Sequence, residues 1–267
     1  MIDWDDAFDN SGYVPGVTDL FDMWTRQAAG YRTALDGRAE LDLAYGPAPR
    51  ERLDLFHPRG TASGVLVFVH GGYWHMMDKS HWSHLAAGAL HHGWSVAIPA
   101  YPLAPDASIS QIVTSITRAL TFAGDRVAGP IRLCGHSAGG HLVSRMMCRD
   151  TLADETAARL ARVTSISGVH DLRPLTATRL NETLKLTAAE AQAQSPALAD
   201  PRPGIPATFW VGADERPEFL RQTRLIAERW GLKDIDVTAV YDMGRHHFNV
   251  LEPLADPDSA LVNEVLR

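Results

Sequence analysis

The chain has 267 residues, of which 45% are hydrophobic and 21% charged, and its formal net charge is −7. This is ordinary globular composition, and an acidic balance without a basic cluster argues against nucleic-acid binding. The first residues are acidic and polar, unlike a signal peptide, and no apolar run is long enough to span a bilayer. We therefore expect a soluble, cytoplasmic protein that does not bind a membrane.

The expected strands begin after a helical segment at residues 17–31, where apolar residues recur at three- and four-residue spacing. LDLAYG and RLDLFHP then alternate apolar and polar residues, which is typical of half-buried antiparallel strands. GVLVFVHGG and WSVAIPAYP are nearly continuous apolar runs, as in strands buried on both faces of a sheet. Further strands are predicted at IRLCGHS, RVTSISG, ATFWVGAD and DVTAVYD.

Helices are predicted between and after these strands, and together they indicate an α/β fold. The alternation predicts a mostly parallel sheet wrapped by helices, with two antiparallel strands leading in. The Pro-rich segment 195–207 reads as a loop inside a single domain, residues 1–267, because the strand–helix alternation resumes after it. Residues 169–193 are expected to form a small cap excursion above the sheet. The helices are expected at residues 79–92, 110–124, 138–149, 217–230 and 256–266.

A candidate nucleophile lies in CGHSAGGH, where Ser137 is the serine of a G-x-S-x-G pattern between a predicted strand and a predicted helix. Such a serine sits on a sharp turn with its hydroxyl exposed. The alternative is a Gly-rich turn with a capping serine. Asp214 and Glu215 follow a later strand, and the pair His246 and His247 follows the next. Each could be a polar loop, but their joint order of serine, acid and histidine predicts a catalytic triad.

The segment HGGYW follows a buried strand upstream of the serine, where lipases and esterases carry an oxyanion loop. We expect the backbone N–H groups of Gly72, Tyr73 and Ala138 to form an oxyanion hole, and His70 to have a structural role. The alternative is a simple Gly-Gly turn. Met76 and Met77 are expected to serve packing, as are His136 and His141 through packing or hydrogen bonds. The sequence has no motif for a metal or cofactor, and we expect neither.

HGGYW followed by GHSAGGH resembles the arylformamidase (kynurenine formamidase) branch of the α/β-hydrolases. The resemblance extends over nearly the whole chain from about Tyr45 onward. It implies an α/β-hydrolase fold, with His247 as the base and Glu215 as the acid. Glu215 followed by Arg216 departs from the aspartate and small residue of many relatives, so Asp214 stays the alternative acid. The other similar blocks are YGPAPRERLDLFHP, SGVHDLRPL, LTAAEAQAQSP, ERPEFLRQ and HHFNVLEPL.

The resemblance implies a serine hydrolase that converts N-formyl-L-kynurenine to L-kynurenine and formate through an acyl-enzyme, without a cofactor. Tyr73 and Trp74 are then expected to line the substrate pocket. Arg173, Arg179 and Asn181 of the excursion could bind an amino-acid head group or form a solvated face. The alternatives are a carboxylesterase for short-chain esters and a non-catalytic binding protein of the same fold. The expected partner is a small aryl formamide or ester, and a homodimer is one option for the assembly.

Overall fold

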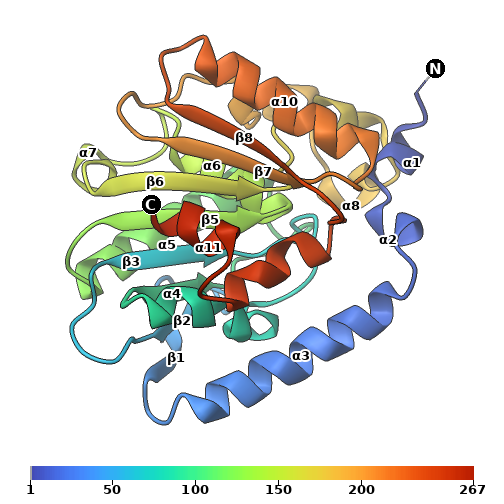
Figure 1. The fold of residues 1–267 in the computed structure, drawn as a ribbon. Helices are drawn as coiled ribbons and strands as arrows, with labels where there is room; N and C mark the ends of the chain where they lie inside the picture. Colours follow the sequence, from blue (N-terminus) through green and yellow to red (C-terminus); the bar gives the residue numbers. More distant parts are fainter. Residues whose placement is uncertain (1) are drawn as a thin grey trace.

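An eight-stranded sheet forms the centre of the protein in the computed structural model, which describes residues 2–267 (Figure 1). The strand order is β1-β2-β4-β3-β5-β6-β7-β8. β1 (Ala39–Ala44) pairs antiparallel with β2 (Arg52–Phe56), β2 pairs antiparallel with β4, and the other pairs are parallel. This confirms the predicted mostly parallel sheet. The remaining strands are β3 (Val65–Val69), β4 (Ser95–Pro99), β5 (Ile131–His136), β6 (Leu160–Ile166), β7 (Ala207–Gly212) and β8 (Val237–Asp242).

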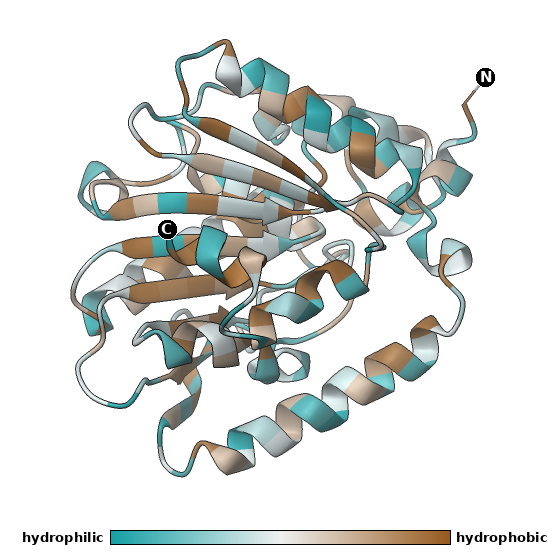
Figure 2. Cartoon of the chain, viewed as in Figure 1, coloured by the Kyte–Doolittle hydropathy of each residue, from teal (hydrophilic) through white to brown (hydrophobic). Residues whose placement is uncertain are grey.

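Helices cover both faces of the sheet and bury a separate hydrophobic cluster on each. α5 (Ile109–Arg126), α6 (Ala138–Met146) and α10 (Pro217–Gly231) cover one face. α3 (Val17–Ala34), α4 (Ala87–His91) and α11 (Ala260–Leu266) contribute to the cluster on the other. Figure 2 shows predominantly hydrophobic central strands and hydrophilic residues along the outer sides of α3 and α10. The sheet is therefore a rigid platform, and its strand ends can hold side chains in fixed positions.

Two predicted helices differ from the structure. Residues 79–92 form two 3₁₀ turns, η1 (Lys79–His81) and η2 (Ser83–Ala86), before the short α4. This segment is tied to the first two strands, because the Lys79 ammonium lies 2.7 Å from carboxylate oxygens of both Asp42 and Asp54. The last helix, predicted from residue 256, begins at Ala260, and the Ser259 side chain caps its first turn. The 3₁₀ segment η5 (Asn249–Ala255) precedes it in the chain.

The N-terminal segment runs past the ends of the strands before it enters the sheet. It comprises α1 (Trp4–Phe8), α2 (Asn10–Tyr13) and α3. In Figure 1, α1 and α2 lie beside the end of the sheet to which the parallel strands point. The excursion 169–193 contains η3 (Arg173–Ala177), α8 (Asn181–Leu184) and α9 (Ala188–Ala193), and η3 packs against α1. The remaining short elements are α7 (Asp154–Ala157) and η4 (Pro196–Leu198).

None of the helices in residues 2–267 combines the length and the apolar character that crossing a bilayer requires.

Candidate active site

Ser137 occupies a strained turn between the end of β5 and the start of α6. Its backbone has φ 56° and ψ −118°, a conformation that non-glycine residues adopt rarely. The glycines on either side make the turn sterically feasible. A Cβ added to Gly139 would lie 1.9 Å from the Val69 carbonyl oxygen, and one added to Gly135 would lie 2.2 Å from the Gly139 carbonyl oxygen. The G-x-S-x-G spacing therefore reflects close packing of α6 on the strands, with the serine side chain at the turn.

A hydrogen-bonded chain connects this serine to a histidine and a carboxylate. The Ser137 hydroxyl lies 3.0 Å from Nε2 of His247, and Nδ1 of His247 lies 2.7 Å from Oε2 of Glu215. All three side chains are buried. Because Nδ1 faces a carboxylate, it carries the proton, and Nε2 is left to accept the proton of Ser137. This is the geometry that activates a serine nucleophile.

Glu215, and not the neighbouring Asp214, contacts His247. Asp214 is exposed, and its backbone N–H donates to the carbonyl of Arg245 at 3.0 Å. Glu215 turns inward after β7 and is 3% exposed. The longer glutamate side chain thus bridges from the strand end to the histidine. Of the two acids left open by the sequence pattern, only Glu215 has the position that the predicted role requires.

Two further groups hold the second carboxylate oxygen of Glu215. The hydroxyl of Ser167 donates to Oε1, and the N–H of Gly212 donates to the same atom at 3.0 Å. Ser167 follows β6, is fully buried and has φ 52°. Sequence reasoning missed this residue, although it stands in the SGVHDLRPL block, near the end of the predicted strand RVTSISG. These donors orient the carboxylate so that its other oxygen meets His247.

We expect Ser167→Ala to lower kcat about tenfold, because removing a hydrogen bond to a charged group costs roughly 1.5–3 kcal/mol and loosens the carboxylate. Steady-state kinetics should show little change in KM. Ser165→Ala is the matched control: Ser165 is also buried near the end of β6, but its hydroxyl contacts Nε2 of His170 at 2.9 Å. Equal losses of kcat in both variants, at equal melting temperatures, would contradict a positioning role for Ser167.

The HGGYW loop lies against the serine and carries free backbone donors. A Cβ added to Gly71 would lie 3.0 Å from the Cβ of Ser137. Gly72 and Tyr73 have positive φ values of 110° and 46°. Within residues 2–267, no acceptor is hydrogen-bonded to the N–H of Gly72, Tyr73 or Ala138. Free N–H groups close to a candidate nucleophile are what an oxyanion hole requires.

The structure gives His70 a structural environment, as expected. Its Nδ1 lies 2.7 Å from the Gly71 carbonyl oxygen, and its ring stacks on Tyr101 at 4.5 Å between centroids. Complete burial lowers the pKa of His70 to about 4, so the ring is neutral at neutral pH. His136 is also buried, and its Nε2 donates to the carbonyl of His247 at 2.7 Å. Both histidines therefore support the loops around the serine.

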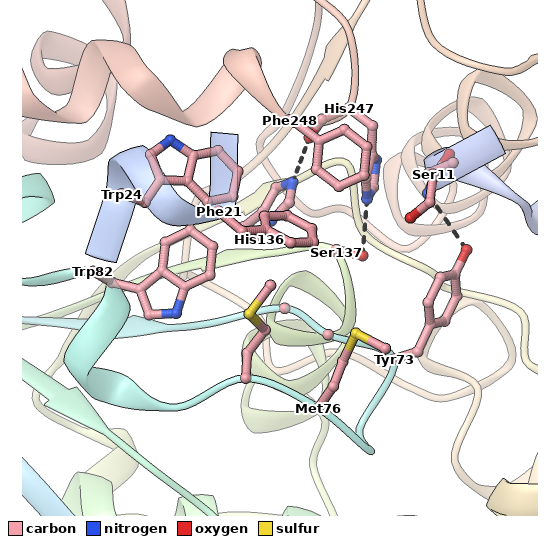
Figure 3. Close-up of a pocket in the computed structure, with 14 residues that line it drawn as sticks. Ser11, Phe21, Trp24, Tyr73, Met76, Trp82, His136, Ser137, His247 and Phe248 are labelled. Atoms are coloured by element: carbon pink, nitrogen blue, oxygen red, sulfur yellow. Dashed lines mark hydrogen bonds between the residues drawn. The ribbon is translucent and has the colours of Figure 1, made fainter. Parts of the chain in front are cut away.

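A cavity opens beside Ser137 (Figure 3). Figure 3 shows Phe21, Trp24 and Trp82 on one side of the serine, and Tyr73 and Ser11 on the other. The N-terminal segment thus supplies a wall that sequence reasoning missed. Phe21 and Trp24 are three residues apart in the predicted helix 17–31, and this spacing was the available signal. The other lining residues are Asn10, Gly71, Gly72, Met76, Met77, His136, His247 and Phe248.

The prediction that Trp74 lines the pocket was wrong. Its side chain is fully buried, and its indole N–H donates to Nδ1 of His141 at 3.2 Å. With φ 46° at Tyr73 and 58° at Trp74, the loop sends the two neighbouring rings in different directions, with ring planes at 62°. Met77 packs against the core as expected and also lines the cavity, whereas Met76 lines the cavity and is 42% exposed.

The excursion 169–193 carries the three side chains that the sequence left open as head-group or solvated residues. Every residue of this segment is described, and none lines the cavity beside Ser137. Arg173 is paired with Asp171 at 2.9 Å, and Arg179 with Asp5 at 3.1 Å. Asn181 exchanges hydrogen bonds with the backbone of Leu186. These side chains hold the excursion and α1 together.

In the part of the chain that the structure describes, no three His, Cys, Asp or Glu side chains are grouped so that they could hold a metal ion.

The strand order and the serine turn define the α/β-hydrolase class. The sequence model of the family described as "alpha/beta hydrolase fold" matches residues 66–247, and the chain belongs to this family. The chain is thus a hydrolase. It is similar to the kynurenine formamidase of Salmo salar, with 28% identity over 85% of this chain and 81% of that protein. The Drosophila melanogaster kynurenine formamidase is 27% identical over 91% of this chain and 86% of its own length. These relatives confirm the resemblance to arylformamidases.

Solved structures of hydrolases have the same fold. One from a Silicibacter species, described as a candidate thioesterase, has a TM-score of 0.96 and 46% identity, with 100% of both chains covered. An esterase of Pyrobaculum calidifontis has a TM-score of 0.71 and 19% identity, with 94% of this chain and 92% of that chain covered. At 19% identity, the likeness to the Pyrobaculum calidifontis esterase shows a shared fold and nothing further.

Proposed function

We propose that the chain is a serine hydrolase that cleaves N-formyl aryl amides through an acyl-enzyme, with N-formyl-L-kynurenine as the first candidate substrate. The products would be L-kynurenine and formate. The observation that carries this proposal is the hydrogen-bonded series of Ser137, His247 and Glu215 beside a cavity lined by aromatic rings. The two relatives named kynurenine formamidase support the choice of a formamide.

In the first half of the reaction, Oγ of Ser137 attacks the formyl carbon while Nε2 of His247 takes the hydroxyl proton. A C–O bond forms, and the carbonyl electron pair moves onto oxygen. The N–H groups of Gly72, Tyr73 and Ala138 are available to stabilise this oxyanion. Glu215 stabilises the charged imidazole. The C–N bond then breaks, and His247 delivers its proton to the nitrogen of the leaving aryl amine.

In the second half of the reaction, the aryl amine has left the site and a water molecule takes its place beside the formyl-enzyme. His247 takes a proton from the water as its oxygen attacks the formyl-enzyme, and then returns a proton to Oγ of Ser137 as formate leaves. Because a formyl carbon carries only hydrogen beside its oxygen, the acyl side of the site needs very little space. The aromatic cavity is then available to the aryl amine.

The second candidate function is a carboxylesterase for short-chain esters, since the same three side chains cleave esters and amides. The relative described as a candidate thioesterase makes thioesters a further class of acyl donor to test. A non-catalytic binding protein is disfavoured, because all three members of the triad are present and correctly spaced.

Steady-state kinetics with the purified protein should separate these substrate classes. We expect kcat/KM for an aryl formamide, either N-formyl-L-kynurenine or N-formylaniline, to exceed that for p-nitrophenyl acetate and a short acyl thioester by about tenfold or more. The reverse order, with esters or thioesters about tenfold ahead of both formamides, would overturn the formamidase proposal and favour the esterase.

A further inference from the structure

The cavity beside Ser137 is uncharged. Among the residues that the structure describes, its lining includes no Asp, Glu, Lys or Arg side chain. Three of its aromatic groups form one cluster: the Trp24 ring centroid lies 4.9 Å from that of Trp82 and 6.4 Å from that of Phe248. The polar lining groups outside the triad and its supporting histidine are neutral, chiefly the Asn10 amide and the Ser11 and Tyr73 hydroxyls. The space therefore suits a flat, neutral ring with a neutral polar substituent.

Charged side chains do lie nearby, but they are engaged with one another outside this cavity. Arg216 pairs with Asp6 at 2.9 Å, and its Nε donates to the carbonyl of Asp9 at 2.7 Å. Arg179 pairs with Asp5. These residues belong to the contact between the N-terminal segment and the rest of the chain.

Tyr73 and the N-terminal segment close the polar side of the cavity. The Tyr73 hydroxyl donates to the carbonyl of Phe8 at 2.5 Å and accepts from the Asn10 amide at 3.4 Å. These contacts tie the loop beside Ser137 to the junction of α1 and α2. The lining of this cavity offers no cation to a carboxylate on a substrate ring, and Arg179 in the neighbouring hollow beyond Asn10 is already paired with Asp5. An unpaired buried charge is strongly disfavoured.

We propose that the cavity binds the ring of an uncharged N-formylaniline, and that this enzyme does not recognise the α-amino-acid head group of N-formyl-L-kynurenine. This inference rests on the proposed function, because it assumes formyl transfer from an aryl amine to Ser137. Within the aryl formamides of the proposed function, it ranks neutral compounds above N-formyl-L-kynurenine, and a ring substituent such as a ketone can then meet Asn10 or Ser11. Each turnover consumes one aryl formamide and one water, and yields one aryl amine and formate.

A matched pair of substrates tests the inference on the unaltered protein. N-(2-acetylphenyl)formamide has the ring, the formamide and the ortho ketone of N-formyl-L-kynurenine, but lacks the amino-acid group. We expect its kcat/KM to be higher by about tenfold or more, because no ion pair compensates for the desolvation of the charged groups. A higher kcat/KM for N-formyl-L-kynurenine would overturn the inference and leave the formamidase proposal standing. If neither formamide is hydrolysed while p-nitrophenyl acetate is, the proposed function itself fails.

A charge introduced into the cavity provides an independent test. Met76 lines the cavity and is 42% exposed, so that a lysine can replace it without entering the core. We expect Met76→Lys to shift the kcat/KM ratio of the two formamides toward N-formyl-L-kynurenine by about fivefold or more, because the new ammonium group can pair with the carboxylate. Met243→Lys is the matched control, since Met243 is 80% exposed and lies outside the cavity. An unchanged ratio in Met76→Lys would contradict the placement of the substrate ring.

Discussion

Ser137→Ala is expected to abolish hydrolysis, with kcat falling by a factor on the order of 10⁴ or more. The hydroxyl of Ser137 is the group 3.0 Å from His247, and alanine retains the backbone while removing the nucleophile. Labelling by a fluorophosphonate probe should disappear in parallel, since the probe phosphonylates an activated serine. The measurement is gel fluorescence after probe treatment, combined with steady-state kinetics on an aryl formamide.

Ser144→Ala is the control for this experiment. Ser144 is a buried serine of α6, and its hydroxyl donates to the carbonyl of Gly140 at 2.8 Å, away from the triad. This variant should keep the labelling. Labelling that persists in Ser137→Ala would contradict the assignment of the nucleophile. A folded wild-type protein that is neither labelled nor active would instead favour a non-catalytic binding protein.

Glu215→Gln is expected to lower kcat by a factor of about 10²–10⁴, whereas Asp214→Asn should leave it nearly unchanged. The Glu215 carboxylate accepts the Nδ1 proton of His247 at 2.7 Å and stabilises the imidazolium that forms when Ser137 attacks. A glutamine in its place has no charge and can present its NH₂ group, which favours the wrong histidine tautomer. Paired kinetic measurements on the two variants check this difference.

The two substitutions are matched, since each replaces a carboxylate by an amide at adjacent positions. Asp214 is exposed, so its replacement should not alter the fold. Circular dichroism and melting temperature should establish that Glu215→Gln is also folded. A crippled Asp214→Asn with an active Glu215→Gln would show that the loop after β7 is arranged differently during catalysis and that the acid is Asp214.

The positions of the strands along the chain could be predicted from the sequence because each has a local cause. Val65–Val69 is apolar at every position and is buried at every position, as a strand covered on both faces must be. Ser137 could be located because the strained turn requires glycines at Gly135 and Gly139, where any Cβ would collide with backbone. His247 followed from its position after a strand together with the family resemblance.

The wall of the cavity could not be predicted in the same way, since it depends on contacts between distant segments. Phe21 and Trp24 reach Phe248 only because α3 passes the ends of the strands, and the Phe21 and Phe248 rings then lie 5.7 Å apart. A local pattern identifies the apolar face of α3, but it contains no information about which segment that face will cover.

The sequence by itself determined the alternating strands and helices, the glycine-bounded serine turn and the chain order of serine, acid and histidine. These properties follow from local sterics and from the burial of apolar runs. Only the tertiary structure decided that Glu215 faces His247, that Ser167 holds the carboxylate and that Trp74 turns away from the cavity. The direction of a side chain in a loop depends on backbone angles and on partners far along the chain. A shift of one residue, from Asp214 to Glu215, separates a solvated carboxylate from a buried one.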